Sequence, residues 1–130
     1  MQTKTLFETF AVIKPDLSVT TKNLSDSIYQ ELDDEFSSFK GHSLVSAHEY
    51  NENWQSWEKH PAGDEIVILL SGQCELIIRF DKKQQQRVLS QQGDYVVIPK
   101  NHWHTARIST PTRVLFITPG QGTQNTTTPF

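Results

Sequence analysis

The chain has 130 residues, the length of one domain with a single core. Its net charge is −3 and no basic patch stands out, so we expect neither nucleic acid nor an anionic membrane as a partner. The longest apolar stretch, residues 66–70, is too short to span a bilayer, and the N-terminus lacks the apolar core of a signal peptide. The one cysteine, Cys74, cannot form an internal disulfide, and we expect a cytoplasmic protein.

The first part of the chain, residues 1–42, is expected to carry one strand and one helix. Residues 7–13 have a strand pattern, which ends at Lys14-Pro15-Asp16. An apolar residue then recurs every four positions from Leu24 to Phe36, which predicts an amphipathic helix with Asn23 as its N-cap. We expect this helix to pack on the outside of a β core.

The chain from residue 43 onwards has the pattern of an all-β fold. Candidate strands cover residues 44–49, 54–60, 65–70, 74–80, 87–89, 95–98, 104–109 and 113–118. Turn signals recur about every ten residues, which favours a sandwich or barrel. The continuous apolar run at 65–70 is expected to be buried on both faces, with a subunit interface as one possible cover. We therefore predict one domain overall, with a barrel at 43–118 and a C-terminal tail at 119–130 that has no core residue before Phe130.

Two segments carry the chemistry of this sequence. Residues two apart in a strand point to the same face, so Glu58 and His60 point together. Residues 61–64 are turn material that would bring Glu65 back beside His60 on the neighbouring strand. His104 alternates in phase with apolar residues and is expected to face inward. Two imidazoles and two carboxylates inside a barrel would suit a divalent first-row metal.

These segments resemble the two motifs of the cupin superfamily. The spacing of His60, Glu65 and Gly72 matches the later part of the first motif, and that of Gly93, Pro99 and His104 matches the second. The resemblance covers residues 44–118. It implies a double-stranded β-helix, or jelly roll, and it maps the metal ligands of such proteins onto Glu58, His60, Glu65 and His104. Cupins often dimerise through sheet edges, so a homodimer is expected.

Three positions depart from the family pattern. Glu58 stands where a histidine is usual, Asn101 replaces a turn glycine, and Ile108 replaces an asparagine. A set of two histidines and two carboxylates is rich in hard oxygen ligands and disfavours copper, so the expected cofactor is Mn, Fe, Zn or Ni. Alternatively, the metal has been lost and the barrel binds an organic ligand.

Each candidate residue has a plainer interpretation. His60 could cap a β-turn, Glu65 could be a buried acid bonded to the backbone, and Glu58 could be a surface carboxylate beside Lys59. His102 either replaces the missing histidine or lies exposed on the rim. The tryptophan expected near the mouth of the barrel is Trp103.

Two classes of function are consistent with these residues. The first is a metal-dependent enzyme acting on a small polar metabolite, of the dioxygenase, isomerase or lyase type, with Glu65 as the catalytic residue and Glu58 as the other possible base. The second is a non-catalytic cupin that binds or senses a small molecule, with or without a metal. The fold alone does not choose between them.

Overall fold

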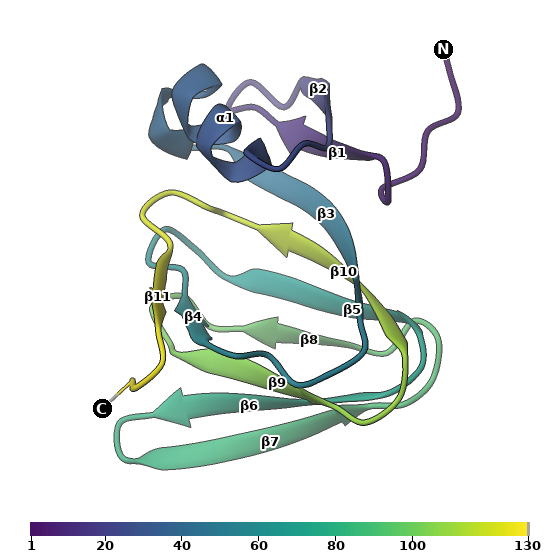
Figure 1. Cartoon of the computed structure of the whole chain (residues 1–130). Coiled ribbons are helices and arrows are strands. Elements are labelled where there is room, and N and C mark those ends of the chain that lie inside the picture. The colour runs from purple at the N-terminus through teal and green to yellow at the C-terminus, as the bar shows by residue number, and fades with distance from the viewer. Residues whose placement is uncertain (130) are drawn as a thin grey trace.

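The structure is a computed structural model and describes residues 1–129. Within these residues the chain forms two antiparallel sheets that face each other, with one short helix near the N-terminus (Figure 1). The expected all-β jelly roll is confirmed. The elements in chain order are β1 (Thr9–Ile13), β2 (Val19–Asn23), α1 (Ile28–Glu35), the 3₁₀ turn η1 (Ser37–Phe39), β3 (Ser43–Tyr50), β4 (Trp57–Lys59), β5 (Glu65–Ser71), β6 (Cys74–Phe80), β7 (Lys83–Leu89), β8 (Tyr95–Ile98), β9 (His104–Ile108), β10 (Thr112–Thr118) and β11 (Gln124–Thr126).

The main core lies between the two sheets. In the described residues one sheet has six strands in the order β2-β1-β3-β10-β5-β8, and the other has five in the order β11-β4-β9-β6-β7. Alternate residues of β5 and β10 face inward and pack against residues of β6 and β9. Full burial of one such aliphatic or aromatic side chain contributes about 1.5–3 kcal/mol. The buried members of this core are Val67, Leu69, Cys74, Leu76, Ile78, Leu89, Ile98, Ala106, Ile108, Val114 and Phe116.

Within the single chain, strand β5 is buried on one face, and the expected cover of its second face by another subunit stays a prediction. Val67 and Leu69 are fully buried, whereas Ile66 and Ile68 between them are only partly buried. They belong to the outer face of the six-stranded sheet. The continuous apolar run therefore contains an ordinary alternation of inner and outer residues.

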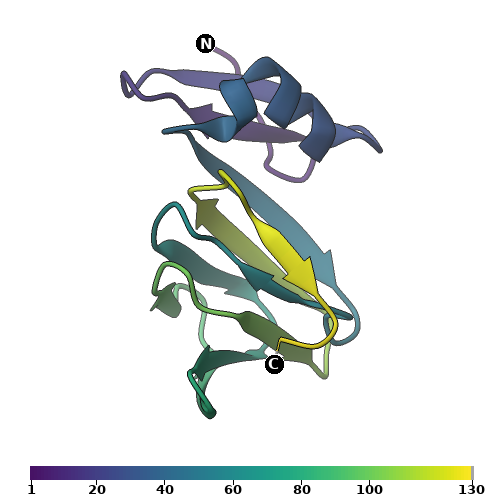
Figure 2. The same ribbon diagram turned by 90° about the vertical axis from the view of Figure 1, so that its left-hand side faces the viewer.

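The N-terminal part forms a layer beside one end of the barrel, joined to it through β3 (Figure 2). Here two predictions made from the sequence were wrong. Residues 19–23 form strand β2, paired with β1, and Asn23 ends this strand instead of capping a helix. Helix α1 begins only at Ile28, with Ser27 at its N-cap, because the Leu24 N–H donates to the Glu8 carbonyl and holds Leu24 to the hairpin.

Helix α1 packs through a small core of its own. Ile28 and Leu32 are buried against Phe10 and Val12 of β1 and Leu44 of β3. Leu24, the first residue of the predicted stripe, is 37% exposed. Among residues 1–129, no helix combines the length and the hydropathy that a membrane crossing would need.

The segment expected to be a C-terminal tail without core residues before Phe130 contributes a strand. β11 pairs with β4 in antiparallel register, with Asn125 opposite Glu58. Phe130, the last residue of the expected tail, lies outside the described residues. The C-terminal strand β11 therefore lies beside β4 at one end of the barrel (Figure 1).

Two motif positions have the backbone conformation that their place in a tight turn requires. Asn101 has φ 63°, so it takes the left-handed conformation of the glycine that it replaces. Gly72 has φ +83°, and a Cβ there would lie 2.4 Å from the Pro111 carbonyl oxygen. Both turns connect strands that carry or support the candidate site.

Candidate metal centre

Three of the four predicted ligands meet at one end of the barrel. Glu58 lies on β4, His60 follows this strand, and His104 begins β9 directly opposite Glu58. One potential ligand atom from each of the three lies within 4.8 Å of the other two. His60 and His104 are buried, and the side chain of Glu58 is about one third exposed.

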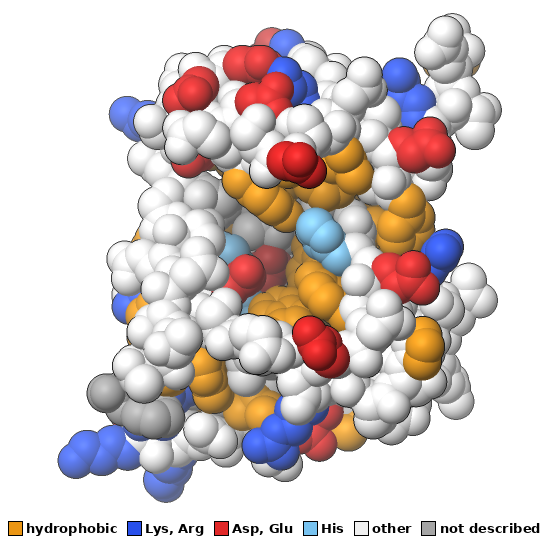
Figure 3. Space-filling view, in the orientation of Figure 1, with side chains coloured by type: hydrophobic (Ala, Val, Ile, Leu, Met, Phe, Trp, Pro, Cys, Tyr) orange, Lys and Arg blue, Asp and Glu red, His pale blue; other side chains and the backbone are white. Residues whose placement is uncertain are grey.

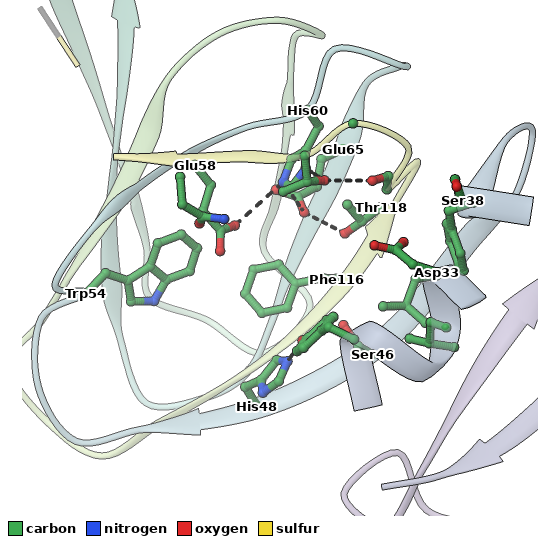
Figure 4. Close-up of a pocket in the computed structure, with 18 of the residues that line it drawn as sticks. Asp33, Ser38, Ser46, His48, Trp54, Glu58, His60, Glu65, Phe116 and Thr118 are labelled. Atoms are coloured by element: carbon green, nitrogen blue, oxygen red, sulfur yellow. Dashed lines mark hydrogen bonds and ion pairs between the residues drawn. The ribbon is translucent and has the colours of Figure 1, made fainter. Parts of the chain in front are cut away.

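Glu65 reaches the same place from the opposite sheet. Expected on a strand neighbouring His60, it lies instead on β5 of the six-stranded sheet, and β4 and β5 are not paired. Its carboxylate still lies beside both histidines, with Oε2 3.3 Å from His60 Nε2 and Oε1 3.1 Å from His104 Nε2. Figure 4 shows Glu58, His60 and Glu65 gathered at one end of a cavity. The barrel interior, not a shared strand pair, brings Glu65 to the cluster.

The hydrogen bonds of His60 and His104 indicate which nitrogen of each ring carries the proton. The Thr123 hydroxyl donates to the Gly120 carbonyl at 2.9 Å, so its oxygen is free to accept from His60 Nδ1 at 2.8 Å. His104 Nδ1 lies 3.2 Å from the His102 carbonyl oxygen, which can only accept. Each neutral ring therefore carries its proton on Nδ1 and presents the lone pair of Nε2 to the cluster, as metal-binding histidines do.

The remaining polar atoms of the cluster are buried and close together, yet they are not hydrogen-bonded. Among the described residues, nothing forms a well-aligned hydrogen bond with Nε2 of His60, Nε2 of His104 or Oε1 of Glu65. The separations are nevertheless short, at 3.3 Å between His60 and Glu65 and 3.1 Å between His104 and Glu65. Buried polar atoms without partners are costly. Atoms directed at a common space rather than at each other fit a cation, and two carboxylates would balance the charge of a divalent ion.

Charge interactions also perturb the metal-free centre. Burial alone would lower the pKa of His60, but Glu58 and Glu65 raise it to about 9. Burial would raise the pKa of Glu65, but His104 and His60 lower it to about 2. The Thr118 hydroxyl further stabilises this carboxylate by donating to Oε2 at 2.6 Å. Without a metal, the centre is therefore held together by a proton on His60 between two carboxylates.

The cluster lies at the inner end of a cavity of about 840 Å³. Figure 3 shows this hollow, with hydrophobic side chains on its walls and acidic and histidine side chains within it. Helix α1 and η1 contribute Tyr29, Leu32 and Phe39 to the wall, so the N-terminal layer helps to enclose the cavity. The helix expected to be an external attachment thus borders the candidate site.

The neighbouring aromatic and histidine residues differ from expectation. Trp54, not Trp103, lines the cavity, and the Trp103 ring lies under the Lys59 ammonium group. His102 does not join the cluster: its ring packs against Phe80, and its Nδ1 lies 2.8 Å from the Lys100 carbonyl oxygen. The interpretation of His102 as a rim residue is the one that its position favours.

Sequence reasoning missed the threonines that hold the cluster. Thr118 orients Glu65 and Thr123 orients His60, although both lie more than fifty positions from their partners. Thr118 ends an apolar alternation, which is a weak signal for an inward side chain. Thr123 stands among polar residues and carries no such signal.

Fold and cluster together define a class: a small antiparallel jelly roll with histidine and carboxylate groups converging at one end of its interior. Residues 47–118, more than half of the chain, match the cupin domain family. The chain belongs to the cupins. No curated protein sequence matches it.

Solved structures with the same fold are distant in sequence. Hydroquinone 1,2-dioxygenase from Sphingomonas sp. TTNP3 is 15% identical with a TM-score of 0.51, and the match covers 58% of each chain. Bacillus subtilis oxalate decarboxylase, described with Mn(II) centres, is 16% identical with a TM-score of 0.52 over 65% of this chain and 23% of that one. Fe(II)-HppE is 10% identical with a TM-score of 0.50 over 58% of this chain and 42% of that one. The likeness establishes the fold alone.

Proposed function

We propose that this cupin is a metal-dependent enzyme that binds a small molecule in its cavity and acts on it beside Glu58, His60 and His104. One observation carries the proposal: both histidines use Nδ1 for internal hydrogen bonds and turn Nε2 toward a shared buried space. Such hydrogen bonds on the far side of the ring orient metal-binding histidines and raise their basicity. The site also opens into a cavity of the size that small molecules occupy.

The proposed metal is Mn or Fe, with Zn or Ni as further candidates. Mixed imidazole and carboxylate sets suit these ions, and two structural neighbours are described with Mn(II) or Fe(II). Glu58, His60 and His104 would hold the ion, and Glu65 would complete the set from the opposite sheet. A bound ion would supply Lewis-acid polarisation of a substrate oxygen, or oxygen activation if the reaction is a dioxygenation.

The two carboxylates of the centre would have different roles. Thr118 and the two histidines fix the Glu65 carboxylate, and its pKa of about 2 makes it a weak proton acceptor in the metal-free protein. Glu58 is more accessible and lines the cavity, so it is placed to meet a bound molecule. The proposed role of Glu65 as the catalytic base stays a prediction, and Glu58 is the competing candidate.

One observation favours a second candidate function, a binding protein that works without a metal. Protonated His60 pairs with Glu58 at 3.6 Å and with Glu65 at 3.3 Å, so the cluster also satisfies its own charges without an ion. In that case the same cavity would hold its ligand without catalysis.

Metal content distinguishes the two functions. The protein is purified without chelator and without an affinity tag, and metal is measured in the wild type, Glu58→Gln and Glu58→His. We expect about one ion per chain in the wild type, weaker retention in Glu58→Gln, and retention at least as tight in Glu58→His. Glu49→Gln is the matched control, since Glu49 is an exposed acid paired with Arg113. Near-zero metal in every protein, even after incubation with Mn(II) and Fe(II), would refute the metal function.

We also propose that the chain forms a homodimer. Strand β8 lies at an edge of the six-stranded sheet, and its Tyr95 and Val97 are 63% and 50% exposed. A second copy would cover these side chains and the unpaired strand edge. Light scattering coupled to size exclusion gives the mass, and a monomer at all concentrations tested would contradict this proposal.

A further inference from the structure

The cavity has two chemically different ends. The metal centre occupies one end, and aromatic rings line much of the other, which we call the aromatic chamber: Tyr29, His48, Tyr50, Trp54 and Phe116. The rings contact one another, with centroid distances of 5.6 Å for Tyr50–Trp54, 5.9 Å for Trp54–Phe116 and 5.9 Å for His48–Phe116. This spacing is typical of packed aromatic pairs, and such walls accept another flat apolar ring.

The aromatic chamber reaches the metal centre without interruption. The Trp54 ring lies 6.1 Å from the His104 ring, and Phe116 lies between Trp54 and His48 in the close-up of the cavity (Figure 4). A ring packed against Trp54 and Phe116 would therefore place its own substituent near the Nε2 atoms of the cluster.

Helix α1 borders the far end of the chamber through Tyr29, which is 54% exposed. The Tyr29 hydroxyl and His48 Nε2 are 2.9 Å apart and hydrogen-bond to each other, which joins the helix to β3 across the chamber. These two polar groups therefore satisfy each other, whereas the buried Trp54 Nε1 has no hydrogen-bond partner among the described residues and could donate to a ligand oxygen. Burial lowers the pKa of His48, which favours the neutral ring in this pair.

The charges of the cavity select against polyanions. Among the described residues that line it there is no lysine or arginine, whereas Asp33, Glu58 and Glu65 are acidic. A metal could neutralise one anionic group at the inner end. A second anionic group in the aromatic chamber would find no lysine or arginine among the described lining residues, so phosphorylated compounds and dicarboxylates fit poorly.

We propose that the ligand of this cupin is an aromatic molecule with a single oxygen-bearing group, whose ring packs in the aromatic chamber and whose oxygen faces the metal centre. The proposal rests on the metal function proposed above and specifies its substrate class. It assigns Trp54 and Tyr29 as residues that determine specificity.

Three probes with the same acid group test the chamber. Acetate has no ring, phenylacetate adds one ring, and 1,4-phenylenediacetate adds a second carboxylate at the far end. Each is titrated into the Co(II)-loaded protein, and binding is read from the visible absorption of the ion. We expect phenylacetate to bind at least tenfold tighter than acetate and tenfold tighter than 1,4-phenylenediacetate.

Variants of two chamber residues test which side chains cause the preference for phenylacetate over acetate. Trp54→Leu keeps an apolar side chain but removes the indole, and Tyr29→Leu removes the phenol from the more exposed helix, so that one variant remains informative if the other fails to fold. We expect each to reduce the ratio of phenylacetate to acetate affinity severalfold, with both affinities measured per bound Co(II). Val88→Ala on β7 is the control and should keep the full preference, because Val88 is 54% exposed and does not line the cavity.

The outcomes separate the two proposals. Failure of the wild type to retain Co(II) would overturn the metal function. Retention of Co(II) with equal affinity for acetate and phenylacetate would overturn the aromatic ligand while leaving the metal function intact. A preference that survives in both folded chamber variants, or that is lost equally in Val88→Ala, would also overturn it.

Discussion

The docking of helix α1 gives a sharp test, because two leucines of one predicted stripe have different environments. Leu32 is 2% exposed and packs with Phe10, Val12 and Phe39, whereas Leu24 is 37% exposed and precedes the helix. Truncation of a buried leucine to alanine costs about 2–5 kcal/mol. Because Leu32 also borders the cavity, part of its surface has few packing partners, and we expect about 3 kcal/mol for Leu32→Ala.

The matched change Leu24→Ala should cost less than about 1 kcal/mol, since its side chain already contacts water. For a domain of this length, 1 kcal/mol corresponds to about 3–4 °C in the melting temperature, so Leu32→Ala should melt roughly 10 °C below the wild type. Urea unfolding followed by circular dichroism, with chelator present to remove metal linkage, measures both free energies. Equal losses in the two variants would refute the start of the helix at Ile28 and the burial of Leu32.

Three further results are expected. Metal affinity should rise with pH, because an ion must displace the proton of His60, whose pKa is about 9. Below pH 9 the affinity should increase about tenfold for each pH unit. Metal titrations at pH 6.5–8.5 that lack this slope would contradict the prediction. Thr123→Val should weaken metal binding about 10–100-fold by removing the acceptor that orients His60, whereas a change confined to folding stability would argue against this role. Gly72→Ala should destabilise the fold more than Gly93→Ala, since both have positive φ but a Cβ at Gly93 meets nothing within 4 Å; equal melting temperatures would dispute the clash with Pro111.

The stability of the metal-free protein should also depend on pH, and the two shifted pKa values give the direction of this dependence. The pKa of His60 is raised from 6.5 to about 9 in the folded state, so its contribution to stability is complete below pH 6.5 and is lost as the pH rises through 9. The pKa of Glu65 is lowered to about 2, so its contribution is present above pH 4.5 and is lost as the pH falls toward 2. Unfolding curves of the chelator-treated protein between pH 6 and 10 test the His60 part, and a flat profile there would contradict it.

The strand pattern and the motif spacing were enough to predict the barrel and the inward direction of the candidate ligands. A period of two puts Glu58 and His60 on one face, and the backbone needs of Gly72 and Asn101 are local properties of tight turns. Such features depend on residues a few positions apart, and the sequence contains that information directly.

Features that depend on distant partners could not be predicted. The bond from His60 to Thr123 joins residues 63 positions apart, and β11 contains only polar residues, so its pairing with β4 leaves no apolar alternation in the sequence. The helix boundary failed for a related reason. Leu24 continues the four-residue period by sequence, but a backbone hydrogen bond to Glu8 holds it in the hairpin.

The candidate ligands come from both sheets, so the geometry of the metal centre depends on how far apart the two sheets lie. Glu65 is carried by one sheet, and Glu58 and His104 by the other, so the distance between the sheets sets the distance between the ligands. That distance is fixed by interior side chains such as Val67 and Ala106, which offer no metal-binding atom but fill the space between the sheets. A screen for variants that fold but no longer retain metal should therefore find substitutions at these interior positions. Such substitutions would move the ligands out of alignment without removing any metal-binding atom.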